Sequence, residues 1–168
     1  NIEKILILAQ KLKNYGVTIA LGGPEVSYRQ KDVLERYSFV DYVLSGEGED
    51  AFPNLLKAVK NGSVPEIKGV SYIKDGEPII SDGEIISFDN SASPYCQEYF
   101  ASLGNRIAYI ESSRGCPFSC AFCLSGRCGK VRFLPLDRVK SEMVMLSDMG
   151  AKTVKFVDRT FNCNQTRA

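Results

Sequence analysis

Apolar residues recur along the chain in two different rhythms, and each rhythm predicts a kind of secondary structure. Where they stand three and four positions apart, they predict helices with one buried face. Where they form short runs bounded by glycine, proline or asparagine, they predict strands. Helices are predicted near residues 1–15, 29–37, 51–60 and 136–149, and strands near residues 17–21, 40–44, 69–74, 77–80, 106–112 and 153–157.

The helical spacing also assigns an inward face to three of the predicted helices. An apolar stripe on a helix normally lies against a sheet or another helix, so these residues form the expected core. They are Ile2, Ile5, Leu6, Ala9 and Leu12 in the first helix, Ala51, Phe52, Leu55, Leu56 and Val59 in the third, and Val139, Met143, Leu146 and Met149 in the last.

The order of the elements predicts an α/β fold in three parts. Strands and helices alternate over residues 1–64, which favours parallel βα units and a partial Rossmann-like domain. Residues 65–105 contain a hairpin around an Asp-Gly turn and a further short strand at residues 84–88, and they form a linker. Residues 106–168 repeat the strand–loop–helix–strand pattern and predict the start of a partial TIM-type barrel. Because a whole barrel takes roughly 200 residues or more, we expect the chain to be part of a longer protein.

Composition removes several classes of function. The chain has 21 basic and 20 acidic residues, so its charge gives no reason to expect nucleic acid as a partner. No apolar run approaches the roughly 20 residues of a membrane span, and no secretory signal is visible. The chain contains no histidine, which excludes Ser–His or Cys–His catalytic pairs and histidine metal ligands.

Six cysteines are too few for a disulfide scaffold in 168 residues, and most of them gather in one segment. That distribution predicts metal ligation in a reducing, cytoplasmic compartment. Cys116, Cys120 and Cys123 have the spacing C-x3-C-x2-C, and three thiolates on one loop suit an iron–sulfur cluster or zinc. Three ligands leave one iron of a cubane cluster open to a small molecule. Cys96 and Cys163 are isolated and are expected to be buried thiols.

Two other interpretations of the cysteines stay open. Cys128 follows Cys123 by five residues, so four thiolates could hold a structural zinc ion, although zinc sites favour paired C-x2-C units. The same four cysteines could hold an electron-transfer cluster. In either case the chain would be a non-catalytic metal-binding module.

The x3-x2 cysteine spacing, the aromatic Phe122 before the third cysteine and the preceding apolar strand resemble the radical S-adenosylmethionine superfamily. The resemblance implies that Cys116, Cys120 and Cys123 hold a 4Fe–4S cluster, whose open iron chelates S-adenosylmethionine. Reductive cleavage of S-adenosylmethionine would then start a radical modification of an unknown small substrate. It also implies that Phe122 lies beside the adenine, and that an external donor of the flavodoxin or ferredoxin type supplies the electron.

Asp158 follows the last predicted strand, where members of that superfamily often carry a Gly-Gly-Glu stretch that meets the amino group of S-adenosylmethionine. This stretch is missing here. Asp158 takes the acidic role in one interpretation, accepting hydrogen bonds from the ammonium group. In the other, it caps a turn or pairs with Arg159.

Two glycine loops follow the first two predicted strands, at Gly22-Gly23 and at Gly46-Glu47-Gly48. The second matches the dinucleotide pattern G-x-G-x-x-A, but the carboxylates at that helix start would repel a pyrophosphate. The pair of loops resembles cobalamin-dependent radical S-adenosylmethionine proteins, a group related to anaerobic magnesium-protoporphyrin IX monomethyl ester cyclase. This resemblance implies that Gly22, Gly23, Gly46, Glu47 and Gly48 edge a cobalamin in the full-length protein. The group's D-x-H-x-x-G loop is absent.

Overall fold

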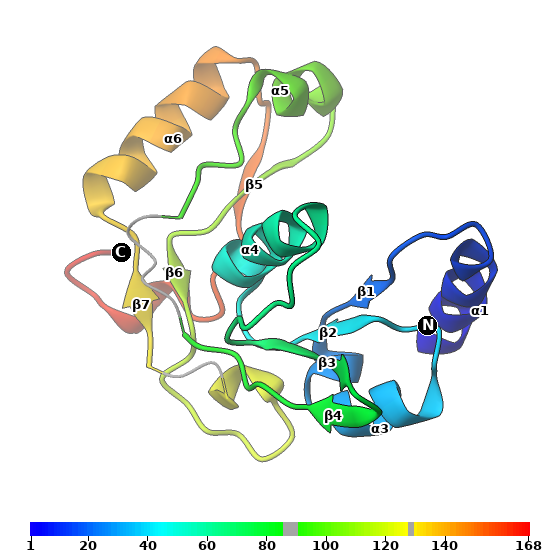
Figure 1. The fold of residues 1–168 in the computed structure, drawn as a ribbon. Helices are drawn as coiled ribbons and strands as arrows, with labels where there is room; N and C mark the ends of the chain where they lie inside the picture. Colours follow the sequence, from blue (N-terminus) through cyan, green and yellow to red (C-terminus); the bar gives the residue numbers. More distant parts are fainter. Residues whose placement is uncertain (86–90, 128–129) are drawn as a thin grey trace. The chain divides into compact units, whose positions relative to one another are not determined.

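The computed structural model describes all residues except 86–90 and 128–129, and it divides the chain into two compact units, Asn1–Ile86 and Ser87–Ala168. Each unit combines helices with a small sheet that contains a parallel strand pair (Figure 1). The predicted α/β class is therefore confirmed, while the predicted three-part division stays a prediction. None of the helices in the described ranges is both long and apolar enough to cross a membrane.

The first unit is built on a four-stranded sheet with the strand order β1-β2-β3-β4. β1 and β2 are parallel, whereas β3 runs antiparallel to both β2 and β4. The elements are α1 (Ile2–Lys13), β1 (Ala20–Leu21), α2 (Pro24–Ser27), α3 (Gln30–Arg36), β2 (Tyr42–Leu44), α4 (Gly48–Lys60), β3 (Val70–Lys74) and β4 (Glu77–Ile79). All predicted elements of this region exist except a strand at residues 84–88: residues 84 and 85 are not in a strand, and 86–88 lie outside the described residues.

The pleat of β2 divides the core of this unit between two faces, because successive side chains of a strand point to opposite sides. Val43 is completely buried on one face, against Val33 and Leu34 of α3. Tyr42 and Leu44 face the other way, onto the cluster of α4 and β3. α3 and α4 accordingly cover opposite sides of the sheet (Figure 1).

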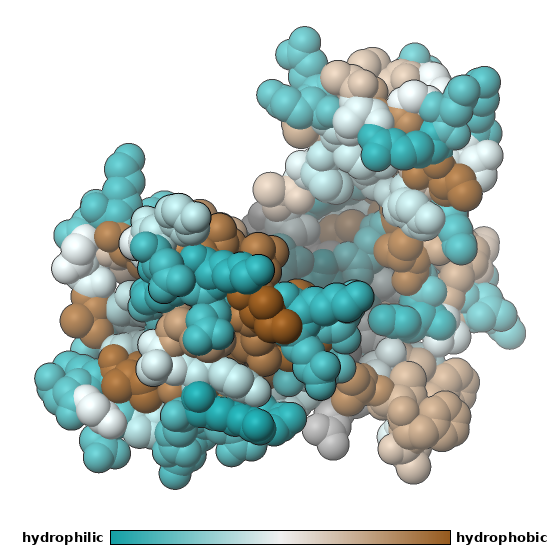
Figure 2. Space-filling view, turned by 90° about the vertical axis from the view of Figure 1, so that its right-hand side faces the viewer, coloured by the Kyte–Doolittle hydropathy of each residue, from teal (hydrophilic) through white to brown (hydrophobic). Residues whose placement is uncertain are grey.

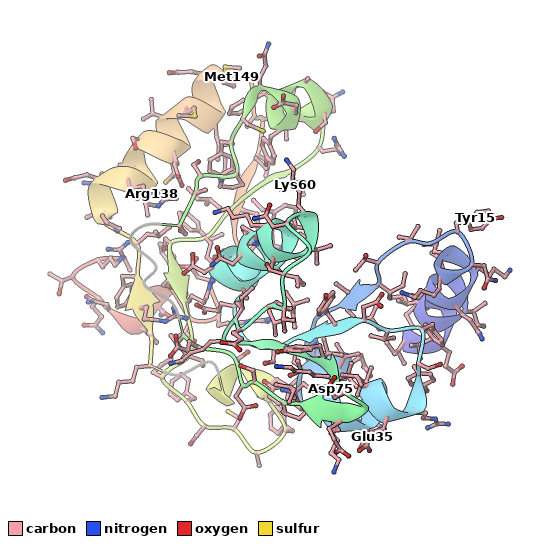
Figure 3. The ribbon with its side chains drawn as sticks, viewed as in Figure 1. Tyr15, Glu35, Lys60, Asp75, Arg138 and Met149 are labelled. Carbon is pink, nitrogen blue, oxygen red and sulfur yellow. The ribbon has the colours of Figure 1, made fainter. Side chains whose placement is uncertain are left out.

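The β3–β4 hairpin has the turn that its sequence predicts. Asp75 and Gly76 have φ angles of 52° and 85°, the left-handed pair that a two-residue turn needs. Asp75 lies at the tip of the hairpin (Figure 3). After β4, the chain passes close to the end of β2, where Gly83 packs directly on Gly46. Ser71 is fully buried there, and its hydroxyl accepts a hydrogen bond from the amide of Ser81 at 3.0 Å.

The second unit has a parallel pair, β5 and β8, and a separate antiparallel pair, β6 and β7. Its core lies between β5, α5 and α6 and is centred on Ala108, Ile110 and Leu146. The elements are α5 (Gln97–Leu103), β5 (Ala108–Ile110), β6 (Ser113–Arg114), the 3-10 turn η1 (Leu124–Arg127), β7 (Arg132–Phe133), α6 (Leu136–Asp148), β8 (Val154–Phe156) and the 3-10 turn η2 (Phe161–Cys163). The sequence did not predict α2, α5, β6 or β7.

The predicted inward face of α6 is partly wrong. Val139 and Leu146 are buried as expected, but Met143 and Met149 are exposed. Glu142, which lies between Val139 and Leu146 in the sequence, is buried instead. The helix touches its unit along the i, i+3, i+7 row, which contains position 142 and not 143. Burial of the Glu142 carboxylate is offset because Arg138, one turn earlier on the same helix (Figure 3), donates to it at 3.1 Å.

The predicted faces of α1 and α4 are also broader than the observed ones. Only Ala9 is buried in α1, and only Ala51 and Leu55 are buried in α4. Each helix rests on its neighbours along a narrow stripe, so the flanking apolar residues stay at the surface, where apolar atoms lie among hydrophilic ones (Figure 2). The residues wrongly predicted to be buried include Ile5, Leu12, Phe52 and Leu56.

Replacement of Gly83 by alanine is expected to lower the free energy of unfolding by about 2 kcal/mol, because an added methyl group overpacks a rigid backbone crossing. A Cβ at this position would lie 2.5 Å from the Cα of Gly46 and closer still to the carbonyl of Ser45. Urea denaturation followed by far-ultraviolet circular dichroism measures the change. The matched control is Gly48→Ala, where an added Cβ meets nothing within 4 Å. Equal stability of the two variants would contradict the crossing.

Tyr95 makes the stability of the second unit depend on pH in the alkaline range. Its hydroxyl donates to the carbonyl of Tyr109 at 2.7 Å, and burial, with the negative charge of Glu142 as a smaller cause, raises the pKa of Tyr95 to about 12. Because the folded state holds this proton more tightly, the contribution is complete below about pH 10 and is lost as the pH rises towards 12. Tyr95→Phe is therefore expected to destabilise the chain by about 1 kcal/mol at neutral pH and by less above pH 10. Urea denaturation at both pH values checks this, with Tyr15→Phe, an exposed tyrosine (Figure 3), as control; a pH-independent loss would contradict it.

Candidate functional site

The three cysteines with x3-x2 spacing lie on one loop, residues 115–131, which we call the cysteine loop. The loop begins after β6 and ends at β7. These two strands pair antiparallel, with Ser113 opposite Phe133. The amide of Leu134 also donates to the carbonyl of Ser112 at 3.0 Å. We call Ser112, Ser113, Phe133 and Leu134 the loop neck. It holds the two ends of the cysteine loop together.

Within the loop, the thiols lie at different depths. Cys120 and Cys123 are exposed and are joined by a turn, in which the amide of Cys123 donates to the carbonyl of Cys120 at 3.0 Å. Cys116 is half-buried close to the neck, with its Sγ 3.5 Å from the Oγ1 of Thr160. Cys116, the cysteine nearest the neck, therefore contacts the segment that follows β8.

Asp158 binds the loop neck from the end of β8. Its Oδ1 accepts a hydrogen bond from the amide of Ser112 at 2.7 Å. Its Oδ2 accepts from the hydroxyls of Ser112 at 2.5 Å and Ser113 at 2.6 Å. Both serines are nearly inaccessible, at 5% and 3% exposure. The partners of Asp158 in these bonds are the two serines, which neither interpretation from the sequence named, and both interpretations stay predictions.

Arg167 adds a second tie across the neck. Its guanidinium donates to the carbonyl of Leu134 at 2.5 Å and to that of Ser112 at 3.4 Å. The same group lies over the ring of Phe133, 5.0 Å from its centroid. A planar guanidinium can combine donation with stacking in this way, so Arg167 holds both strands of the neck.

A cavity of about 850 Å³ lies beside the cysteine loop. Its lining combines the loop with the segment after β8 and includes Cys116, Phe118, Lys130, Phe133, Asn162 and Cys163. A cavity of this volume is in the range of small-molecule sites, and it has polar and apolar walls. Of the three predicted ligands, only Cys116 reaches it.

Other cysteines and Phe122 differ in their surroundings. Phe122 is 94% exposed, so its ring is available for stacking. Cys96 and Cys163 were expected to be buried, and this expectation is wrong: Cys96 is exposed at the N-terminus of α5, and Cys163 is half-buried at the cavity. Isolated positions give no periodicity from which to predict depth. Cys128 lies outside the described residues. No three cysteine, aspartate or glutamate side chains among the described residues are placed together as metal ligands.

The two glycine loops of the first unit lie at one edge of its sheet, because β1 and β2 are parallel and each loop follows its strand directly. Gly22, Gly23, Gly46 and Gly48 are exposed there, and Glu47 is half-buried. Gly23 precedes α2 and Glu47 precedes α4, so each loop ends at a helix N-terminus. Gly46 also has a packing role, since Gly83 lies against it.

The sequence suggested that the stretch of Ser112 and Ser113 could shape the loop, but it did not identify these serines as partners of Asp158. It did not single out Thr160 or Arg167 at all. A weak signal existed for β7, where Lys130 to Phe133 alternate between polar and apolar residues. No local signal identifies the partners of Arg167, which are 33 and 55 residues away.

No protein-family model matches the chain. An uncharacterised methyltransferase of Pyrococcus horikoshii is 32% identical over 166 residues, which cover 92% of this chain and 36% of that protein. The anaerobic magnesium-protoporphyrin IX monomethyl ester cyclase of Cereibacter sphaeroides is 32% identical over 61% of this chain and 19% of its own length. The cobalamin-dependent radical SAM methyltransferase TokK of Streptomyces tokunonensis is 32% identical over 64% of this chain and 18% of its own length.

Solved structures with low sequence identity share the fold. The cobalamin-dependent S-adenosylmethionine radical enzyme OxsB, solved with aqua-cobalamin and S-adenosylmethionine bound, matches 95% of this chain with a TM-score of 0.73 and 21% identity. The match covers 24% of OxsB, so the chain spans about a third or less of the proteins it resembles. The predicted resemblance is confirmed: the curated proteins similar to this chain include a cobalamin-dependent radical SAM methyltransferase and anaerobic magnesium-protoporphyrin IX monomethyl ester cyclases.

Proposed function

We propose that this chain carries the cluster-binding loop of a radical S-adenosylmethionine enzyme, with Cys116, Cys120 and Cys123 as the ligands of a 4Fe–4S cluster. The observation that supports this best is the cysteine loop, which presents three thiols within eight residues between two ends that β6 and β7 hold together. A loop with fixed ends can return its ligands to one place, as a metal centre requires. The whole protein would modify a small molecule by methyl transfer or by ring closure.

The donor set fits such a cluster. Thiolates are the usual ligands of iron–sulfur clusters, and residues 115–131 contain no carboxylate that would favour a harder metal. Exposure of Cys120 and Cys123 lets the cluster reach them without displacing core side chains. Because metal binding and local folding are coupled, gathering of the three sulfurs would accompany cluster binding.

When bound, the cluster supplies the electron for reductive cleavage of S-adenosylmethionine, and a flavodoxin or ferredoxin in the cytoplasm would reduce the cluster. The chain's own residues have simpler tasks in this proposal. The three cysteines bind iron and leave one iron to the cofactor, and the exposed ring of Phe122 lies next to Cys123, where it can stack on adenine. The cavity beside Cys116 offers room for part of a small molecule.

Anaerobic reconstitution with iron and sulfide is expected to give a brown protein with about four irons per chain, because three thiolates and one exchangeable position complete a cubane cluster. S-adenosylmethionine is expected to change the electron paramagnetic resonance signal of the reduced cluster, since it binds the open iron. The substitutions Cys116→Ser, Cys120→Ser and Cys123→Ser should each lower the iron content.

Cys96→Ser is the matched control, because Cys96 is an exposed thiol outside the loop. It should keep the full iron content. A colourless protein with one zinc per chain would contradict the proposal and would support the structural zinc interpretation. A cluster whose signal ignores S-adenosylmethionine would support an electron-transfer site.

We also propose that the glycine loops of the first unit edge a cobalamin in the full-length protein. Ligands of open α/β sheets bind beyond the carboxyl ends of the parallel strands, which is where the exposed glycines lie. No histidine exists in these 168 residues, so the fit rests on the bare backbone of the loops and excludes an imidazole ligand from this chain.

Retention of hydroxocobalamin through gel filtration by the full-length protein tests this second proposal. Gly22→Leu should lower retention several-fold, because the residue lies on the loop surface and an added Cβ makes only an ordinary contact of 3.7 Å with Leu44. Glu77→Leu is the control and should retain cobalamin fully, because Glu77 is exposed beside the hairpin turn, which the strand register places at the opposite end of β2 from these loops. Failure of the unmodified protein to retain cobalamin, or equal retention by Gly22→Leu, would contradict this role.

A further inference from the structure

We propose that Asp158 is a positioning residue for the cysteine loop: through Ser112 and Ser113 it fixes the strand end from which Cys116 departs, and so determines how firmly the loop holds its cluster. The proposal rests on the cluster function proposed above. It differs from the interpretation in which Asp158 meets the amino group of S-adenosylmethionine, because it assigns the carboxylate to the protein's own loop neck.

Strand register brings Asp158 to the neck. In the β5–β8 pair, Ile110 lies opposite Phe156, an offset of 46 residues. The amide of Val157 donates to the carbonyl of Ile110 at 2.9 Å, so the pairing continues one residue beyond β8. Asp158 and Ser112 share the same offset of 46 residues. The carboxylate therefore reaches the start of the loop because the parallel ladder delivers it there.

The chemistry of the contact makes it firm. Three donors converge on one carboxylate, and the two hydroxyl bonds, at 2.5 and 2.6 Å, fall in the range of charge-assisted hydrogen bonds. The serine hydroxyls are buried, so loss of the carboxylate would leave polar groups without water to replace it. An ammonium group that approached Asp158 would compete with these donors.

The same segment also contacts the first predicted ligand. Thr160, two residues after Asp158, places its hydroxyl 3.5 Å from the sulfur of Cys116. The stretch 158–160 thus touches the neck at one end and the thiol at the other. Groups that orient metal ligands in this indirect way commonly change metal affinity by 10–100-fold when removed. Asp158 is expected to act in that range.

The test compares cluster retention in variants of the chain. Asp158→Asn and the double variant Ser112→Ala/Ser113→Ala should each lose iron to a chelator about tenfold faster than the unmodified protein. Asp158→Glu, which keeps the charge, should recover part of the difference. Asp148→Asn, an exposed aspartate in the same unit, is the matched control and should retain its cluster fully. In all variants, the reduced cluster that remains should still respond to S-adenosylmethionine in its paramagnetic resonance spectrum.

The outcomes separate the proposals. If Asp158→Asn keeps its cluster as firmly as the unmodified protein, Asp158 does not position the loop. If that variant keeps its cluster but no longer responds to S-adenosylmethionine, the carboxylate binds the cofactor instead. Thermal unfolding is measured first, and should Asp158→Asn not fold, Ser113→Ala, which removes one of the three bonds, is read by the same criteria. Failure of the unmodified chain to take up any cluster would overturn the proposed function itself, and this inference with it.

Discussion

The second unit depends on one carboxylate. Asp158 joins the end of β8 to the end of β5 through three hydrogen bonds, and the cysteine loop leaves the unit from that junction. Parallel strands cannot be connected by a tight turn, so no hairpin links these two carboxyl ends, and the Asp158 contact continues the pairing beyond the last ladder hydrogen bond. Arg167 and the β6–β7 pair add further ties at the same neck.

In the first unit, a close approach of two backbone segments holds a strand end in place. The strand end of β2 is fixed because Gly83 packs on Gly46 and because Ser45, Ser71 and Ser81 bond to one another and to the backbone around it. Side chains larger than hydrogen would keep these backbones apart. In both units, then, a loop of functional interest begins at a strand end that several contacts hold in place.

The helices show how narrow the real contacts are. α6 buries the row that contains Val139, Glu142 and Leu146. The helix tolerates a buried carboxylate at Glu142 because the guanidinium of Arg138 pairs with it. Burial, and to a smaller extent the negative charge of Glu142, raises the pKa of Tyr95. Hydropathy alone favours Met143 over Glu142 as the inward residue, because it scores each side chain without its partner. A pair such as Arg138 and Glu142 reverses that preference.

The sequence by itself determined the helices α1, α3, α4 and α6, the strands other than β6 and β7, their order, and the cysteine and glycine loops that follow the strands. These features come from periodicity, turn residues and short spacings, all of which act within a few residues. Only the tertiary structure decided that Asp158 meets Ser112 and Ser113, that Arg167 crosses the neck and that α6 turns Glu142 inward. The partners of Asp158 and Arg167 lie 33 to 55 residues away, and α6 takes its orientation from the surface it packs on. Strand register and packing bring such groups together, and no local pattern records them.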